Sequence, residues 1–478
     1  MKFNRKGLVL LTAAMTLTAC KDFQQSDQPS SSVAPPVEIS TEIPSEPSLD
    51  KQELENRAAA YVESFRQGQF DSFYQEAGTL LQNEITQEQL KQEWSGLMTA
   101  ARVYGGSESI QTTQTEGKTN VQVTSVHSRY HVLTSFTFSD DGTVEALSMD
   151  LGPLAVAPES GENWEEIPIQ LGYDAQKQLN GMLTLPKKVE NPPVVILVHG
   201  SGAQGMDCRI GAADNRPFAD LAQGLADNGI ASIRYDKRSY VYPEDVIDVQ
   251  TEYLYDVQDV VRFALEEPRV DGSQLYLIGH SQGGMLSPKF ALDNPDIKGI
   301  VSLGGTLRRI EDIILEQNKT MMEQNTTLSE EEKAAHIAKI QSELDRVHGL
   351  TPESTDAQDE MLLGYPVSYW VSLNAIDQKA IAQELTIPML ILQGDNDFQV
   401  RYDTDFKLWQ EVLGDRENVT FRHYAGLSHV FMPGSLERFD SSSYDAPAKM
   451  DTQVIQDISG WIHSQTEEEC NSSDGTSS

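Results

Sequence analysis

From about residue 160 onward, short apolar runs alternate with amphipathic stretches. Six runs have the length of buried strands, at 194–198, 230–235, 275–278, 299–303, 389–392 and 419–424. Helical spacing separates several of them, at 218–228, 253–265 and 285–292. This alternation is typical of a parallel sheet covered by helices on both faces. We therefore predict a doubly wound, mostly parallel α/β domain over about residues 160–468, entered through an antiparallel hairpin at 167–171 and 181–185.

One long insertion interrupts the alternation. Residues 307–385 are charged and helical, with no strand signals. In a doubly wound sheet, an insertion at this point lies over the carboxyl ends of the strands, where ligands bind. We therefore expect a helical lid.

The pattern over residues 50–150 predicts a separate small α+β domain. Helical spacing over 58–98 gives way to strand-like alternation over 121–149, with Asp140-Asp141-Gly142 as a hairpin turn. Helices followed by an antiparallel sheet resemble a cystatin-like or nuclear-transport-factor-like module. His127 and His131 stand four apart, which on one strand puts both on the same face, and we interpret them as surface histidines rather than as a binding site.

The first twenty residues resemble a bacterial lipoprotein signal peptide. Lys2, Arg5 and Lys6 precede an apolar stretch over 7–17 that is too short to span a bilayer. It ends in Leu17-Thr18-Ala19-Cys20, similar to a lipobox. This resemblance implies a lipid on Cys20 and an extracytoplasmic protein anchored to a membrane, at the cell surface or in the periplasm. The alternative is an ordinary secretory signal cleaved after a small residue.

Polar segments flank the predicted domains. Residues 21–49 are rich in Ser, Pro, Gln and Glu and predict a flexible tether, and 469–478 predict a disordered tail. The chain carries 36 basic and 73 acidic residues, a net charge of −37. Such a surface repels phosphate backbones, which excludes a nucleic-acid partner. With Cys20 lipidated, Cys208 and Cys470 allow at most one disulfide and no metal framework, and no cofactor is expected.

The strongest chemical signal is the segment Gly279-His280-Ser281-Gln282-Gly283. A G-x-S-x-G pentapeptide is weak evidence by itself. Here an apolar strand leads into it and a helix leads out, which fits a strained strand-turn-helix elbow with Ser281 as nucleophile. Small residues are needed at Gly279 and Gly283, where a side chain would collide as the chain reverses. The alternative is a structural turn serine.

A serine nucleophile needs a base that takes its proton and a carboxylate that orients the base. The segment from Gly394 to Val400 resembles the G-x-x-D-x-x-V turn of esterase-type hydrolases, which implies Asp397 as the acid, with Asp395 as the alternative. His429 follows the strand-like run 419–424 in a loop and is the expected base. His423 within that run is expected to be structural, and His463 lies in the terminal helix.

The negative charge of an acyl-transfer transition state needs amide donors. The amide of Gln282, directly after the nucleophile, is the first candidate. The segment from His199 to Gly202 resembles the His-Gly oxyanion loop of lipases and esterases, which implies the Ser201 amide as the second donor and Gly202 as its alternative. In this pattern His199 is a strand-end residue and not the base.

Together these segments resemble the α/β-hydrolase family over about residues 160–468, and most closely bacterial esterases with a helical lid and an N-terminal accessory module. Further similarities are the segment from Arg234 through Asp236-Lys237 to Arg238 and the segment from Pro366 to Trp370. Ser239-Tyr240 departs from the family, which usually has glycine there.

The resemblance implies a serine hydrolase that cleaves small-molecule carboxylic esters, with short or medium acyl chains or acetylated sugars, through an acyl-enzyme. Alternatives on the same fold are a serine peptidase or aminoacyl hydrolase and an acyltransferase. From another class, a non-catalytic surface-binding lipoprotein stays possible.

Overall fold

A computed structural model describes residues 51–474, apart from short gaps at 102–103, 116–117, 128–129, 155, 157, 174–176, 243–245, 247, 355–359 and 437–440. The predicted signal segment with Cys20 and the predicted tether lie outside the described residues. The chain divides into two compact units at Pro158, and each is described by itself. Among the described residues, no helix combines the length and apolar character that crossing a membrane requires.

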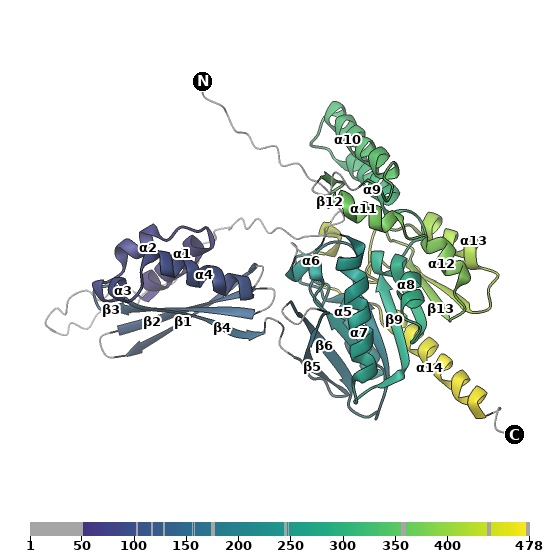
Figure 1. The fold of residues 1–478 in the computed structure, drawn as a ribbon, viewed down its shortest axis with the longest axis horizontal. Helices are drawn as coiled ribbons and strands as arrows, with labels where there is room; N and C mark the ends of the chain where they lie inside the picture. The colour runs from purple at the N-terminus through teal and green to yellow at the C-terminus, as the bar shows by residue number, and fades with distance from the viewer. Residues whose placement is uncertain are drawn as a thin grey trace, which may run out of the picture. The chain divides into compact units, whose positions relative to one another are not determined.

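The N-terminal unit consists of helices packed on one face of an antiparallel sheet (Figure 1). The helices are α1 (Lys51–Arg66), α2 (Asp71–Glu76), α3 (Thr79–Glu84) and α4 (Gln87–Ala101). The strands, in sheet order, are β1 (Tyr104–Thr115), β2 (Lys118–His127), β3 (Tyr130–Ser139) and β4 (Val144–Leu154). Its core is aromatic: the ring of Phe65 lies 5.4 Å from that of Trp94 and 5.0 Å from that of Phe73. Such rings each bury a large apolar area, so they contribute strongly to the stability of this unit.

The structure corrects the interpretation of the two histidines. His127 ends β2, whereas His131 lies on β3, opposite Val126. They therefore belong to two neighbouring strands and not to one face of a single strand. His127 is also buried, with 2% of its surface exposed, so it is not a surface histidine.

The second unit is built on an eight-stranded sheet. In sheet order its strands are β14 (Val419–Tyr424), β13 (Met389–Gly394), β10 (Ile297–Leu303), β9 (Asp271–His280), β7 (Pro193–Val198), β8 (Ala231–Tyr235), β6 (Leu179–Pro186) and β5 (Trp164–Leu171). Neighbouring strands are parallel except that β6 is antiparallel to both β5 and β8. The predicted fold class, a mostly parallel α/β sheet, is confirmed.

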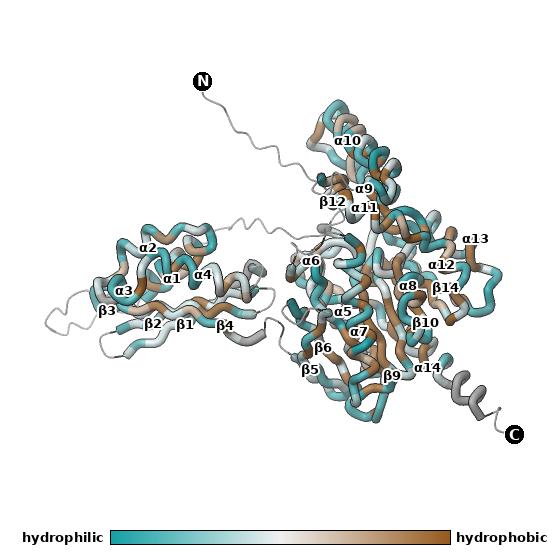
Figure 2. The backbone as a smooth tube through the Cα atoms, in the orientation of Figure 1, coloured by the Kyte–Doolittle hydropathy of each residue, from teal (hydrophilic) through white to brown (hydrophobic). Residues whose placement is uncertain are grey.

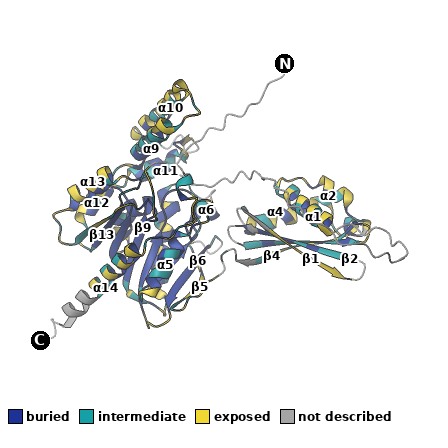
Figure 3. Ribbon diagram, turned by 180° about the vertical axis from the view of Figure 1, so that it is seen from behind, coloured by how far each residue is buried: buried dark blue, intermediate teal, exposed yellow. Residues whose placement is uncertain are grey.

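Helices cover both faces of this sheet. One layer contains α5 (Pro217–Asp227) and α14 (Thr452–Asp474), and the other contains α7 (Tyr255–Glu266), α8 (Gln282–Asp293), α12 (Gln378–Glu384) and α13 (Lys407–Leu413). Along β7, Val195 and Leu197 pack toward the first layer, while Ile196 packs toward the second. This two-sided burial is why the central strands read as continuous apolar runs, and Figures 2 and 3 show them as hydrophobic and buried.

The insertion over 307–385 contains more than helices. It comprises α9 (Ile310–Gln324), α10 (Glu330–His348), a two-stranded hairpin of β11 (Met361–Leu362) and β12 (Tyr365–Pro366), then α11 (Val367–Asn374) and α12. The expectation of no strands was therefore wrong. Contacts of α12 with α8 and α13 place it in the layer on the sheet, so the insertion proper ends before α12. That it acts as a lid stays a prediction.

Shorter elements complete the unit. They are α6 (Arg238–Val241), π-helical turns at Gln250–Leu254 and Tyr402–Phe406, and a 3-10 turn at Ser441–Tyr444. At the other end, α14 continues to Asp474, so the segment predicted as a disordered tail from residue 469 begins inside a helix.

A buried ion cluster joins the antiparallel side of the sheet. Arg234 on β8 is 1% exposed. Its guanidinium donates to Glu166 on β5 at 2.8 Å, to Thr184 on β6 at 2.8 Å and to Asp207 in the loop after β7 at 2.9 Å. One planar cation therefore pairs with two buried carboxylates and ties three strands to that loop.

We predict that Arg234→Met lowers the free energy of unfolding by about 3–5 kcal/mol, because Glu166 and Asp207 would be left buried without this cation. The control is Arg209→Met. Arg209 also pairs with Asp207, at 3.5 Å, but its side chain is 47% exposed. Its loss should cost no more than about 1 kcal/mol. Urea denaturation measures both, and equal losses would contradict the role given to Arg234.

Candidate active site

Ser281 occupies the turn between β9 and α8. Its backbone has φ 54° and ψ −116°, a region that residues with a side chain rarely adopt. Two hydrogen bonds hold this conformation: the Ser281 amide donates to the Leu303 carbonyl at 2.9 Å, and the Met285 amide donates to the Ser281 carbonyl at 2.8 Å. The serine therefore sits at the carboxyl end of a central strand and at the positive end of a helix.

The turn is so tight that two of its neighbours have no room for a side chain. A Cβ at Gly279 would lie 2.2 Å from the Gly283 carbonyl oxygen. A Cβ at Gly283 would lie 2.5 Å from the His199 carbonyl oxygen. Glycine at these positions allows α8 to start directly against the loop after β7.

Asp397 and His429 form a buried pair in the loops after β13 and β14. His429 Nδ1 lies 2.7 Å from Asp397 Oδ2, and both residues are at most 3% exposed. The other carboxylate oxygen accepts the amides of Gln399 at 2.8 Å and Val400 at 2.9 Å. Because the carboxylate holds Nδ1–H, the Nε2 atom of His429 is the end available as a base.

Asp395, His423 and His463 have other partners. Asp395 lies 2.9 Å from Nδ1 of His423 on β14, a pair separate from Asp397 and His429. His463 on α14 contacts the Asn228 carbonyl at 2.9 Å. None of these three residues is joined to His429 by these contacts.

The end of β10 lies between the serine turn and the acid–base pair. Leu303 accepts the amide of Ser281, and the next residue, Gly304, lies against the pair: a Cβ there would be 3.1 Å from His429 Nδ1 and 3.3 Å from Asp397 Oδ2.

His280, next to the serine, makes a second link between the serine turn and the acid–base pair. Its Nε2–H donates to the His429 carbonyl at 3.0 Å, and the two rings are 4.6 Å apart. His280 and Gly304 thus link the turn that carries Ser281 to the buried pair of Asp397 and His429.

The loop after β7 runs against the serine. A Cβ at Gly200 would lie 2.8 Å from Cβ of Ser281 and 3.4 Å from its Oγ. The His199 ring packs 4.6 Å from the ring of Phe218, and its Nε2 donates to the Gly205 carbonyl at 3.0 Å. Burial, with Lys237 nearby, lowers the pKa of His199 to about 3, so this ring is neutral. Of the expected oxyanion donors, Gln282 follows Ser281 directly, and Ser201 follows Gly200 in the loop that runs against the serine; that their amides bind an oxyanion stays a prediction.

Lys237, which the sequence shows only as part of a segment similar to the family, lies within this site. Its Nζ donates to the carbonyls of Gly200 at 2.8 Å and Gly202 at 3.1 Å. The preceding residue, Asp236, accepts the Met206 amide at 2.9 Å, and burial raises the pKa of this carboxyl to about 7. The sequence held one signal for this role of Lys237, which is that charged residues follow a buried strand directly. Charged residues at such a place are usually expected to be exposed in a loop.

Tyr369 of α11 also reaches the site, because its hydroxyl accepts a hydrogen bond from Gln282 Nε2 at 2.9 Å. Nothing in the spacing of the sequence relates these two residues.

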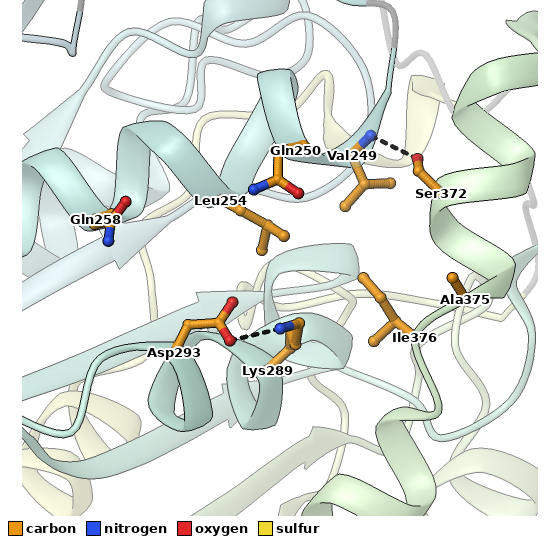
Figure 4. Close-up of a pocket in the computed structure, with 9 residues that line it drawn as sticks. All are labelled: Val249, Gln250, Leu254, Gln258, Lys289, Asp293, Ser372, Ala375 and Ile376. Atoms are coloured by element: carbon orange, nitrogen blue, oxygen red, sulfur yellow. Dashed lines mark hydrogen bonds and ion pairs between the residues drawn. The ribbon is translucent and has the colours of Figure 1, made fainter.

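A cavity of about 630 Å³ lies away from the serine, between α7, α8 and α11 (Figure 4). Its lining combines apolar side chains such as Leu254 and Ile376 with the ion pair between Lys289 and Asp293. None of the predicted site residues lines it. Across the part of the chain that the structure describes, no group of three or more His, Cys, Asp or Glu side chains is arranged to hold a metal ion.

Comparison with known proteins gives a family and several relatives. A family model described as serine aminopeptidase, S33, matches residues 193–433. The esterase EstD of Thermotoga maritima is 33% identical over 286 residues, which is 59% of this chain and 65% of the relative. This chain thus spans just under two thirds of the length of that relative.

Among solved structures, Est1E of Butyrivibrio proteoclasticus is 19% identical and aligns over 63% of this chain and 99% of its own, with a TM-score of 0.40. The esterase domain of a Rhodothermus marinus protein is 13% identical and aligns over 62% of this chain and 97% of its own, with a TM-score of 0.37. The family match covers about half of the chain and includes Ser281, Asp397 and His429. The chain therefore belongs to the serine aminopeptidase S33 family and has the α/β-hydrolase fold.

Proposed function

We propose that this protein hydrolyses small carboxylic esters through an acyl-enzyme formed on Ser281. The observation that carries the proposal is the strained turn of Ser281 beside the buried pair of Asp397 and His429. A serine hydroxyl becomes a useful nucleophile only when a base removes its proton during attack. The base that we propose is His429, and its hydrogen bond to Asp397 supports this role.

In the proposed reaction, Nε2 of His429 takes the proton from Ser281 Oγ as this oxygen attacks the ester carbonyl. The tetrahedral intermediate places its negative oxygen between the amides of Ser201 and Gln282. His429 then gives the proton to the departing alkoxide, which leaves as the alcohol. A water molecule, deprotonated by the same ring, attacks the acyl-enzyme and releases the acid. Asp397 stabilises the imidazolium in both half-reactions.

Two buried carboxylates of the proposed site are already paired, which favours an ester over an N-terminal peptide substrate. An aminopeptidase must neutralise the ammonium group of its substrate, and a free carboxylate is the usual means. Glu252, the buried carboxylate hydrogen-bonded to Tyr369, is paired with Lys237 at 2.8 Å. Asp397 is committed to His429. Similarity to the esterase EstD supports the same choice. The proposed substrates are esters with short or medium acyl groups, or acetylated sugars.

We predict that a fluorophosphonate probe labels the full-length protein on Ser281 and that Ser281→Ala abolishes both the labelling and the hydrolysis of p-nitrophenyl acetate. The physical reason is that Oγ forms the covalent bond. Peptide mass spectrometry locates the label. In a panel of p-nitrophenyl esters, acetylated sugars and aminoacyl anilides, the esters should be cleaved fastest. Preference for the anilides would replace the esterase assignment with an aminopeptidase.

A second prediction separates the two aspartates of the loop after β13. Asp397→Asn should lower kcat by about 10³–10⁴-fold, because an amide no longer favours the Nδ1–H tautomer of His429 or stabilises its charged form. Asp395→Asn is the matched control, and its pairing with His423 predicts little change in kcat. Steady-state kinetics of both variants decide the matter, and the reverse order would assign the acid to Asp395.

We further propose that the protein is held at an extracytoplasmic membrane surface by a lipid on Cys20, as the lipobox-like segment suggests. Cys20→Ala should move the protein from the membrane fraction to the soluble fraction of cells without changing its esterase activity, because the acyl chains are the proposed anchor. Metabolic labelling with a palmitate analogue provides the direct measurement. Membrane association that persists in the unlabelled variant would contradict this anchor.

A further inference from the structure

Lys237 lies buried beneath the loop that follows β7. It is 2% exposed, and its ammonium donates to the carbonyls of Gly200 and Gly202 at 2.8 and 3.1 Å. An ammonium group has three donors and no acceptor, so both carbonyls turn toward it. The orientation of the peptide planes in this loop is therefore set by a charge inside the protein.

This orientation has a consequence for the next amide. The Gly200 carbonyl and the Ser201 N–H belong to one trans peptide, whose planar geometry makes the two groups point in opposite directions. With the carbonyl held by Lys237, the N–H points away from Lys237, while Gly200 itself lies against Ser281. We propose that Lys237 is a positioning residue that aims the Ser201 amide at the developing oxyanion; this inference rests on the proposed ester hydrolysis.

Tyr253 reinforces the same peptide. Its hydroxyl accepts a hydrogen bond from Lys237 Nζ at 2.6 Å and donates to the Gly200 carbonyl at 2.6 Å. The carbonyl oxygen thus receives two donors, one of them charged. Such hydrogen bonds polarise the peptide and make its N–H a stronger donor.

Glu252 stabilises the buried charge of Lys237. Its Oε1 lies 2.8 Å from Lys237 Nζ, and the two side chains are at most 3% exposed. Burial lowers the pKa of Lys237, and the carboxylate of Glu252 opposes that shift. An isolated ammonium in this position would be far less stable than the ion pair.

The same cluster reaches the second proposed donor. Oε2 of Glu252 accepts the hydroxyl of Tyr369 at 2.5 Å, and this hydroxyl in turn accepts Nε2 of Gln282 at 2.9 Å. The side chain of Gln282, whose amide is the other oxyanion donor, is therefore fixed by the group that neutralises Lys237. Near the cavity of Figure 4, the Val249 amide donates to Ser372 at 2.9 Å, which ties α11 to the turn carrying Glu252.

The test compares an oxoester with the matching thionoester in the full chain. Sulfur accepts hydrogen bonds poorly, so cleavage of a thionoester draws little on the oxyanion donors, whereas both substrates use Ser281, His429 and the fold equally. Lys237→Met should lower kcat for the oxoester by about 10²-fold or more, with KM nearly constant. The thionoester should lose only a few-fold. Tyr253→Phe, which keeps the ion pair, should lower the oxoester kcat by about 10-fold.

Arg238→Met is the matched control. Arg238 is equally buried and pairs with Asp256, so its loss removes a neighbouring buried cation that makes no contact with Gly200 in this cluster. The ratio of kcat for the oxoester to kcat for the thionoester in this variant should equal that of the wild type. Should Lys237→Met not fold, Lys237→Met combined with Glu252→Gln removes both charges. Tyr253→Phe keeps both charges and removes one donor to the Gly200 carbonyl, together with a 3.2 Å contact to Gln282 Oε1.

The two ways of failing are distinguishable. If the wild type neither cleaves oxoesters nor reacts with fluorophosphonate at Ser281, the proposed function is wrong and the role of Lys237 is wrong with it. If the wild type does both, but the Lys237 and Tyr253 variants lose oxoester and thionoester activity in equal proportion, Lys237 is structural only.

Discussion

The site depends on an unusually close approach of backbone segments around Ser281. Three segments lie close to Ser281 or its neighbours: the loop after β7, the end of β10 and the start of α8. A Cβ atom at Gly200, Gly304 or Gly283 would lie within 3.1 Å of a neighbouring atom. Ser281 itself is held at a positive φ by the hydrogen bond to Leu303. Strain of this kind costs about 1–3 kcal/mol and persists only where the surrounding structure determines the conformation. The parallel sheet supplies that determination, because three of its strands end at the same edge.

Buried cations organise the loops at that edge. Three cations stand within the five consecutive positions 234–238, at the end of β8 and directly after it. They are Arg234, Lys237 and Arg238, and each is buried and paired with at least one carboxylate. The chain as a whole has a net charge of −37, yet these three cations are internal. Each one needs its partners to offset desolvation, so the segments that bear those partners are fixed relative to β8. Loop geometry near Ser281 is thereby specified by electrostatics as much as by apolar packing.

Each signal in the sequence predicted only the part of the structure that it depends on. Apolar periodicity identified the central strands because they are buried on both faces, and the strand-turn-helix context identified the Ser281 turn. The order of loops along the chain suggested Asp397 and His429. Periodicity failed for β1, whose residues are largely polar, and it joined His127 and His131 into one strand although they lie on neighbouring strands. Lys237 and Tyr369 act through partners far away in sequence, and no local pattern reports such contacts.

The insertion between β10 and β13 has a role that a simple cover would lack. Through Tyr369, α11 bonds both to Gln282 and to the carboxylate that neutralises Lys237. Trp370 on the same helix donates to the Leu362 carbonyl at 2.7 Å and fixes the β11–β12 hairpin to α11. Moving α11 away from the sheet would therefore break bonds that support both proposed oxyanion donors. A route for substrate that leaves these bonds intact requires α11 to stay in place.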